Sequence, residues 1–408
     1  MKRVPKWVAA FGVLALIGAA CSDDGTSPGG DGSSASAVSS IGPTEGELNL
    51  IAWVGYTEDG TTEGYENYDW ITPFEDSTGC EVSVKYADSS DEMYNLMTSQ
   101  AGQWDGVSAS GDSSNRLIAS GAVSAIDPAL FDFTDIIPPL DPMTGTETSQ
   151  YVVDGNVYGV PWMYGPNFLM YNSDVVDPAP TSWDVAFETE LNGAPNPYAG
   201  SVTAYDFPIY IADAAVYLMT HQPDLGITDP YSLTEEQLDA AVELLKGQST
   251  LINKYWASYV TAIDGFVDGS MVAGTGWPVN LSYAEADNPA VLAVEPSEGM
   301  TGWADTWMMS SSAPHPNCML EWMDYSLGAD VQAQTAEYYG AAASNTAACP
   351  ILRDSLDEQF DFGDAVDTVR YGYCGDEAFL ESLWLWRTPQ APTDYSVWTQ
   401  KWTEIRGA

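Results

Sequence analysis

The chain has 408 residues, with 59 Asp and Glu against 12 Lys and Arg, which gives a formal net charge of −47 at pH 7. Nucleic acids and anionic lipid surfaces are recognised by basic patches, so this balance excludes both as natural partners. The length suits two domains beyond a leader, and 45% hydrophobic residues are enough for a sizeable core. The acidity has two interpretations, a solvated salt-tolerant surface or a field that concentrates cationic ligands. Only carboxylates inside a site would therefore identify a ligand.

The first residues have the pattern of a secretory signal. Three basic residues precede an apolar run over residues 7–17, and small residues then lead to Cys21. The run is too short for a permanent membrane span, and no later apolar segment is long enough for one. We therefore expect a signal peptide over residues 1–20 and an exported protein.

The residues around Cys21 suggest how the exported chain is held. Cys21 follows Gly18-Ala19-Ala20, which resembles the lipobox of bacterial lipoproteins, whose Cys becomes the lipidated N-terminus. The alternative is an ordinary signal peptide that leaves a free Cys21. The following residues are almost all small or polar and cannot form a core. We expect residues 21–46 to be a lipid-anchored flexible tether on the outer face of the membrane or in the periplasm, with the lipid as the only membrane contact.

After the tether, apolar runs alternate with helical patterns. This rhythm is typical of a parallel sheet with covering helices, that is, an α/β fold. The expected elements are a strand at 48–53, a helix at 68–78, a strand at 81–86, a helix from Ser90, a strand at 104–108 and a helix at 113–120.

The second half continues with mixed elements. Thr234 to Gln237 form a capping box, and the apolar residues that follow share one helix face over 234–247. The other expected elements are an extended stretch at 158–171, a helix after 181–184, a strand at 200–204, a strand at 303–310, a helix after Pro316 and a helix at 331–339.

Beyond Cys21 the chain has four cysteines, an even number that predicts two disulfides in an exported protein. Of the three possible pairings we expect Cys318–Cys349 and Cys80–Cys374. The chain has no C-x-x-C motif and only two histidines. We therefore expect no metal site, no cofactor and no His-dependent catalytic triad.

Seven short motifs carry a family resemblance: Ala52-Trp53-Val54-Gly55-Tyr56, Ser89-Ser90-Asp91-Glu92-Met93, Trp104-Asp105-Gly106-Val107, Tyr158-Gly159-Val160-Pro161-Trp162-Met163-Tyr164-Gly165, Thr181-Ser182-Trp183, Pro296-Ser297-Glu298-Gly299 and Gly302-Trp303-Ala304-Asp305. Their order and spacing resemble the spermidine/putrescine-binding branch of the substrate-binding proteins of ABC transporters. The resemblance covers most of residues 47–339, whereas the residues after 339 match poorly.

The resemblance implies a fold and a function. The fold is a two-lobed, periplasmic-binding-protein-like (type II) α/β fold with a ligand site in the hinge cleft. Lobe 1 would comprise residues 47–164 and 306–345, and lobe 2 residues 165–305 and 346–408. The function is extracytoplasmic binding of a small cationic ligand and its delivery to an ABC permease, and we expect a monomer.

A polyamine site needs carboxylates for the ammonium groups and aromatic walls for the cations and methylenes. An aromatic residue and an acid lie two residues apart in a late strand of the family, and Trp303 and Asp305 match them. The other site residues that the resemblance implies are Trp53, Tyr56, Trp277 and the hydroxyl-bearing Ser110.

The chain also departs from the family pattern. Gly55 stands where polyamine binders carry an acid, and Asp206 is only an approximate match to a second-lobe acid. Asp112 could replace a missing carboxylate, or it could be a solvated loop residue. Arg387 would suit a ligand carboxylate if it faced the cleft, and otherwise it would be a surface or ion-paired arginine.

Two other functions stay open at this stage. The same fold could bind a sugar, a betaine or an amino-acid derivative; two separated acids in the cleft would favour a diamine, and one acid a singly cationic or neutral ligand. A secreted hydrolase with a carboxylate pair is the third possibility. No G-x-S-x-G elbow or Gly-rich phosphate loop is present, so we expect a binding protein and not an enzyme.

Overall fold

The computed structural model describes residues 40–144, 150–360 and 373–407. The expected signal peptide, the lipidation site Cys21 and most of the tether fall outside these ranges. Within them, no helix combines the length and the apolar character that a membrane span requires.

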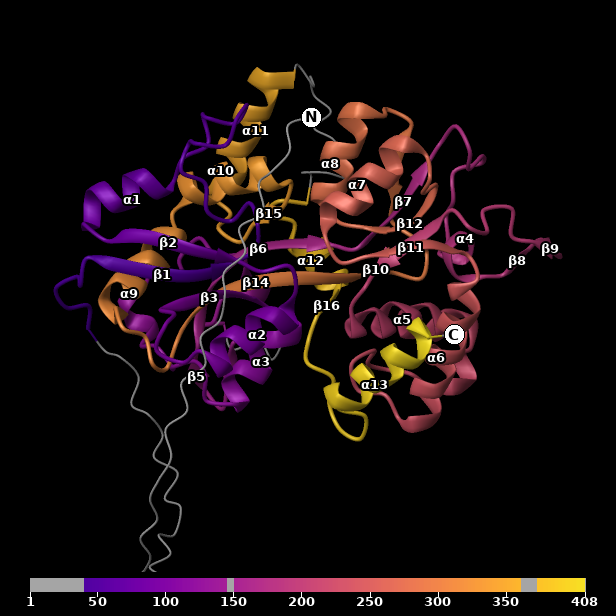
Figure 1. Ribbon diagram of the computed structural model, residues 1–408, viewed down its shortest axis with the longest axis horizontal. Helices are drawn as coiled ribbons and strands as arrows, with labels where there is room; N and C mark the ends of the chain where they lie inside the picture. Colours follow the sequence, from indigo (N-terminus) through magenta and orange to yellow (C-terminus); the bar gives the residue numbers. More distant parts are fainter. Residues whose placement is uncertain (1–39, 145–149, 361–372, 408) are drawn as a thin grey trace, which may run out of the picture. The chain divides into compact units, whose positions relative to one another are not determined.

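The first sheet begins with the predicted alternation of strands and helices. β1 pairs in parallel with β2 on one side and with β3 on the other, and α1 and α2 connect them. The long strand β14 then runs antiparallel to both β3 and β6 (Figure 1). In the described part of the chain the strand order is β15-β6-β14-β3-β1-β2, with β16 beside β14. These strands are β1 (Glu47–Ala52), β2 (Glu81–Tyr86), β3 (Gly106–Ser110), β6 (Gly159–Pro166), β14 (Thr301–Met309), β15 (Ala342–Ala343) and β16 (Trp384–Leu385).

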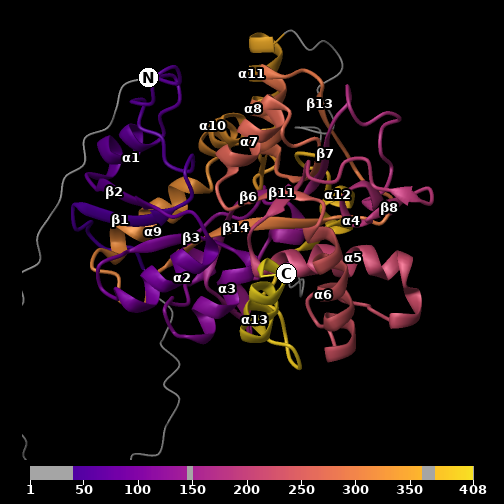
Figure 2. The same cartoon turned by 45° about the vertical axis from the view of Figure 1, so that its right-hand side comes forward.

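The second sheet has the order β11-β10-β12-β7-β13. Helices α7 and α8 lie on one side of it and α5 and α6 on the other (Figures 1 and 2). Its strands are β7 (Phe168–Asn172), β10 (Val202–Tyr205), β11 (Ile252–Trp256), β12 (Ala273–Gly276) and β13 (Val291–Val294), and two small hairpins are formed by β4 (Val152–Val153) with β5 (Asn156–Val157) and by β8 (Glu190–Leu191) with β9 (Ala194–Pro195).

Helices cover both sheets. The predicted capping box is confirmed, because Thr234 accepts from the backbone N–H of Gln237 and the Gln237 side chain accepts from the backbone N–H of Thr234. The helices are α1 (Ile71–Thr78), α2 (Ser90–Ser99), α3 (Gly111–Ala119), α4 (Asp184–Phe187), α5 (Ile211–His221), α6 (Glu235–Ser249), α7 (Tyr259–Asp268), α8 (Pro278–Asp287), α9 (Pro316–Ser326), α10 (Ala329–Tyr339), α11 (Ala348–Phe360), α12 (Glu377–Ser382) and α13 (Tyr395–Arg406), with short 3₁₀ turns at Pro128–Leu130, Pro138–Leu140, Pro208–Tyr210 and Pro223–Leu225.

In the middle of the described chain, two passages between the two sheets lie next to each other, and a third follows β16 on the way to α13. β6 ends at Pro166 and β7 begins at Phe168, and β13 leads into β14. The two crossings are joined because the backbone N–H of Asn167 donates to the carbonyl of Thr301 at 2.9 Å. The Thr301 hydroxyl in turn donates to the buried Asp213 of α5 at 3.0 Å. This buried polar chain fixes the start of β14, the strand that carries Trp303 and Asp305.

The C-terminal stretch 346–408, expected in the second lobe, is divided between the two sheets. β16 pairs with β14, and α11 packs on α10, so both belong with the first sheet. Only α13 packs on α6 beside the second sheet. β16 pairs with Thr301 and Gly302, which the prediction placed in the second lobe, so only α11, packed on α10, departs from the predicted division. The other lobe boundaries stay predictions.

The disulfide pairing predicted from the sequence was wrong. The structure joins Cys80 to Cys318 and Cys349 to Cys374, with Cα–Cα distances of 5.9 and 5.6 Å. The first pair forms because α9 packs against β1 and α1, which brings Cys318 next to the start of β2. An even cysteine count gives the number of disulfides, whereas this helix packing decides the partners.

Candidate functional site

A small pocket lies where the ends of several elements meet. Its free volume is about 10 Å³, roughly the space that one water molecule needs, so the surrounding side chains nearly fill it. Its wall is almost entirely aromatic, and Asp305 is the one ionisable carboxylate among the described residues that line it. The lining residues are Trp53, Tyr56, Ser110, Trp277, Trp303, Asp305, Tyr339 and Trp386.

Strand geometry places Trp303 and Asp305 together. Residues two apart in a strand point to the same face, so both side chains face the pocket. Asp305 lies opposite Ser110 in the pairing of β14 with β3. On the other side, the pairing of β14 with β6 shifts register between Ala304 and Thr306, a bulge of the kind that re-aims side chains.

The Asp305 carboxylate is buried and held by two hydroxyl groups. Tyr56 Oη donates to Oδ2 and Ser110 Oγ donates to Oδ1, both at 2.6 Å. Burial raises the pKa of this carboxyl to about 7, although the two hydrogen bonds act in the opposite direction and the charge of Asp112 adds to the rise. No Lys, Arg or His is among the described residues that line the pocket. An ionised Asp305 therefore lacks a positive partner there.

The aromatic walls are set by close backbone packing. In the pairing of β6 with β14, Gly165 lies opposite Trp303. A Cβ atom on Gly165 would lie 2.7 Å from the Trp303 indole, so only glycine leaves room for the ring in this position. Tyr339 packs edge-on against both Trp303 and Tyr56, with ring centroids 6.3 and 5.0 Å away.

Gly55, the position where an acid was expected from the family pattern, has a structural explanation. Its φ is +91°, a region that favours glycine. A Cβ atom there would lie 2.9 Å from the Tyr339 ring. The space that an acidic side chain would need is therefore filled by Tyr339.

All eight predicted site residues lie in the described part of the chain, and six of them line the pocket. Asp112 does not line it, although it is buried nearby in the first turn of α3. Its carboxylate accepts a hydrogen bond from Ser90 at 2.9 Å. Burial raises the pKa of Asp112 to about 6. The structure thus gives Asp112 a partner on α2 and not a place in the pocket wall.

Asp206 also lies outside the pocket, which corrects its expected role. Its Oδ1 atom accepts from Trp402 Nε1 and from Arg406 Nε, both at 3.0 Å, so it holds α13. Arg387 does not line the pocket either, because it pairs with Asp229 at 2.9 Å. Of the two interpretations of Arg387, the ion-paired arginine fits the structure.

Two wall residues were missed, Tyr339 and Trp386. Tyr339 is the last residue of α10, and an aromatic residue on a buried helix face is expected to pack in the hydrophobic core. Trp386 follows the two-residue strand β16, in the region where the family resemblance is poor. The only local signal was the run of large apolar residues Trp384-Leu385-Trp386, which weakly favours a short strand.

A second hollow adjoins the pocket. It has a free volume of about 80 Å³ and shares Trp53, Trp277 and Tyr339 with the pocket wall. Exposed Asp88 is the carboxylate on its lining. An elongated ligand could therefore extend from Asp305 past these three rings toward a second acid.

Two α/β sheets with two adjacent crossings, and an aromatic pocket holding one buried carboxylate, define a binding protein for small solutes. A family profile described as bacterial extracellular solute-binding protein matches residues 69–352, more than half of the chain. The chain belongs to this family. Membership agrees with the predictions of an exported chain and of a binding protein that is not an enzyme.

Known proteins of similar sequence and fold support the same assignment. The putrescine/agmatine-binding protein of Pseudomonas aeruginosa is 26% identical over 344 residues, which cover 79% of this chain and 87% of the relative. The spermidine/putrescine ABC transporter substrate-binding protein PotD of Streptococcus pneumoniae has a TM-score of 0.65 at 19% identity, covering 88% of this chain and 97% of PotD. MotA of A. tumefaciens B6, solved with glucopine, also has a TM-score of 0.65, at 15% identity over 88% of this chain and 99% of MotA. The predicted two-lobed fold is therefore confirmed.

Proposed function

We propose that the protein binds a polyamine of the putrescine or spermidine type between its lobes and delivers it to the permease of an ABC importer. The sequence relative that binds putrescine and agmatine, by its name, supports this ligand class. The leader pattern supports a lipid anchor at Cys21 outside the membrane. Sugars and other neutral ligands are less well supported, because they would leave Asp305 without a counter-charge.

The observation that carries the proposal is the environment of Asp305. A buried carboxylate without a cation costs free energy, and here burial raises its pKa to about 7. A primary ammonium group would supply the missing charge. The surrounding indole and phenol rings would add cation–π attraction of about 0.5–2 kcal/mol each.

The ligand-binding roles assigned to Trp53, Tyr56, Ser110, Trp277, Trp303 and Asp305 are part of this proposal. The pocket alone, with its single acid, would suit a singly cationic ligand, and the second acid that favours a diamine is Asp88 of the adjoining hollow. One ammonium group would lie against Asp305. The methylene chain would pass Trp53, Trp277 and Tyr339 into the adjoining hollow, where a second ammonium group would face Asp88. Polyamines would then be preferred over singly charged amines of the same length.

A thermal-shift and calorimetric comparison of the mature protein tests the ligand class. Putrescine and spermidine should raise the melting temperature, while γ-aminobutyrate, glycine betaine and glucose should raise it less or not at all, because binding to the native state alone stabilises it. The measurement is made at high salt, since at 1 M salt the Debye length is about 3 Å and nonspecific attraction to the acidic surface is screened. A shift with betaine or glucose alone would contradict the polyamine proposal.

The anchor is tested separately by fractionating cells that express the wild type or Cys21→Ala. The wild type should be found with the membrane and the variant in the soluble exported fraction. A membrane-bound Cys21→Ala protein would contradict lipidation at this residue.

A further inference from the structure

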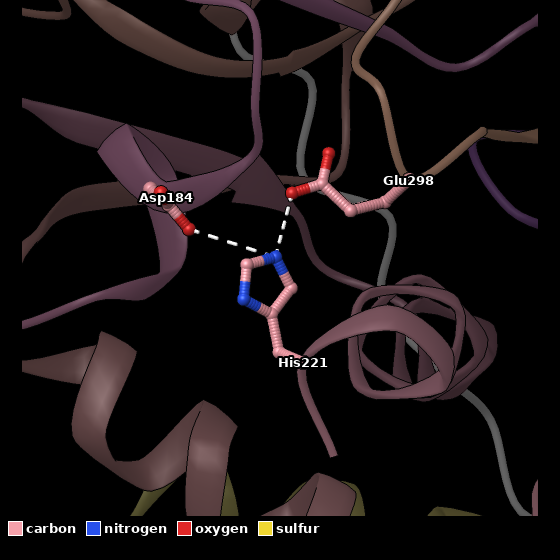
Figure 3. Close-up of side chains that lie close together, drawn as sticks. All are labelled: Asp184, His221 and Glu298. Atoms are coloured by element: carbon pink, nitrogen blue, oxygen red, sulfur yellow. Dashed lines mark hydrogen bonds and ion pairs between the residues drawn. The ribbon is translucent and has the colours of Figure 1, made fainter. Parts of the chain in front are cut away.

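A cluster of three ionisable side chains lies outside the pocket. Figure 3 shows Asp184 of α4 and Glu298, from the turn between β13 and β14, on either side of His221 at the end of α5. His221 Nε2 is 2.8 Å from Glu298 Oε1 and 3.7 Å from Asp184 Oδ1. The three atoms lie within 4.8 Å of one another. Both carboxylates thus approach the same imidazole nitrogen.

Neighbouring side chains fix the orientation of the three groups. The Tyr217 ring stacks on the His221 ring, with centroids 3.9 Å apart and an interplanar angle of 13°. The Tyr217 hydroxyl donates to Asp184 Oδ1 at 2.7 Å, and Ser182 Oγ donates to Glu298 Oε1. Hydrogen bonds of this kind, which orient the ligand atoms, are typical of metal sites in proteins.

The cluster carries an excess of negative charge. Glu188 Oε1 lies 2.8 Å from the same Tyr217 hydroxyl, whose single proton can bond only one of Asp184 and Glu188 at a time, so a third carboxylate adjoins the cluster. Even with a proton on His221 the net charge would be −2. Among the described residues no Lys or Arg pairs with Asp184, Glu188 or Glu298. The Glu298 side chain is only 1% exposed, so water screens it little.

We propose that Asp184, His221 and Glu298 bind a divalent transition-metal ion, Zn²⁺ by preference. With metal–ligand bonds of about 2.0–2.2 Å, tetrahedral ligand atoms lie roughly 3.4 Å apart. The two separations from His221 Nε2, 2.8 and 3.7 Å, bracket this value, and the two carboxylate oxygens lie no more than 4.8 Å apart. Water would fill the fourth position, and the imidazole ligand disfavours Mg²⁺ and Ca²⁺, which prefer oxygen.

The second histidine of the chain is a natural contrast. His315 also lies between two acids, but Asp105 contacts its Nδ1 at 2.9 Å and Glu47 approaches its Nε2 at 3.7 Å. Because the acids approach different ring nitrogens, they cannot converge on one ion with His315. His315 is therefore the matched control for nonspecific binding by imidazole and acidic surface.

The test is calorimetric titration of the chelator-treated mature protein with ZnCl₂, in high salt and excess Mg²⁺. We expect one bound Zn²⁺ in the wild type and in His315→Gln, with at least about tenfold weaker binding in His221→Gln. Titration with Co²⁺ adds a spectroscopic readout, since bound tetrahedral Co²⁺ should give visible absorption in the wild type and in His315→Gln but not in His221→Gln.

Two results would overturn the proposal: no saturable Zn²⁺ binding to the wild type, or equal binding by His221→Gln and His315→Gln. If His221→Gln fails to fold by circular dichroism, Asp184→Asn replaces it, because the Asp184 side chain is 42% exposed and tolerates substitution better. Putrescine titrations on the same samples keep this test independent of the proposed function.

Discussion

Two acidic side chains seven residues apart illustrate two uses of a buried carboxylate. Glu298, before β14, accepts hydrogen bonds from Ser182 and His221, and although burial raises its pKa, these bonds bring it below its usual value. Asp305, within β14, lacks a positive neighbour, and burial raises its pKa to about 7. In a chain with 59 acidic residues, the count of acids says little about a ligand. The difference between these two shows that Asp305, which has no positive neighbour among the described residues, marks a site for a whole positive charge, whereas Glu298 already shares the imidazole of His221.

The strongest test of this contrast is the substitution Asp305→Asn, which keeps the shape of the side chain and removes its charge. We expect putrescine affinity to fall at least about 100-fold, because the ligand ammonium group would be buried without a partner. The ligand-free variant should be no less heat-stable than the wild type at pH 8, since ionised Asp305 lowers native stability above its unfolded pKa.

Calorimetry and thermal unfolding measure both effects. Asp206→Asn is the control, because Asp206 pairs with Arg406 outside the pocket and its loss should leave affinity unchanged. Equal losses in the two variants would mean that bulk charge, and not Asp305, attracts the ligand.

The pH dependence of binding is a second test of the pocket. In the proposed site a cation would bind the ionised form of Asp305, whose pKa burial raises to about 7. The dissociation constant should therefore rise about tenfold from pH 8 to pH 6, as the ligand must displace a proton. Calorimetry in buffers of different ionisation enthalpy should detect proton release below pH 7. Asp305→Asn should lose this dependence, and a flat profile in the wild type would contradict the assignment.

The aromatic wall should contribute less than the charge. Trp53→Leu should weaken putrescine binding by about 3- to 30-fold, which corresponds to a cation–π contribution of about 0.5–2 kcal/mol. Trp104→Leu is the matched control, because Trp104 is equally half-buried but donates its indole N–H to Gln100 away from the pocket. Similar affinities of the two variants would exclude Trp53 from the site.

The smallest expected effect lies at Glu298. In chelator-treated protein, Glu298→Gln should lower the free energy of unfolding by about 1 kcal/mol, because a charge-assisted contact with His221 is lost. Denaturant unfolding measures this, with Glu190→Gln as a control on an exposed acid of β8. Asp305→Asn should thus leave the free energy of unfolding unchanged or raise it, whereas Glu298→Gln should lower it. A lower free energy of unfolding in both variants would contradict the proposed difference between the two acids.

Much of this fold could be predicted from the sequence. The alternation of strands and helices in the first sheet follows from apolar periodicity. The capping box of α6 was also predicted correctly, because it depends only on residues close together in the sequence. Trp303 and Asp305 could be named because they match an aromatic–acid pair of the family that the chain resembles, and their two-residue spacing in a strand is consistent with a common face. The other predicted pocket residues came from the same resemblance.

The remaining features depend on contacts between distant segments. The sequence around Asp206 does not indicate that α13 packs over this residue. An aromatic residue at a helix end, such as Tyr339, is predicted from sequence to be a core residue and not a pocket residue. Cys80 meets Cys318 only because α9 packs beside α1. Asp184, His221 and Glu298 follow no motif spacing, and they come from two helices and a turn that only the folded chain brings together.

Gly165 affects the width of the pocket although it is not one of the lining residues. It does not line the pocket, yet the Trp303 ring occupies the space a larger residue would need. A single methyl group at this position would push the indole, and the width of the binding pocket would change without any wall residue being replaced. Under the proposed function, a change at Gly165 would alter the selectivity among amines of different bulk, although Gly165 is not one of the residues that line the pocket.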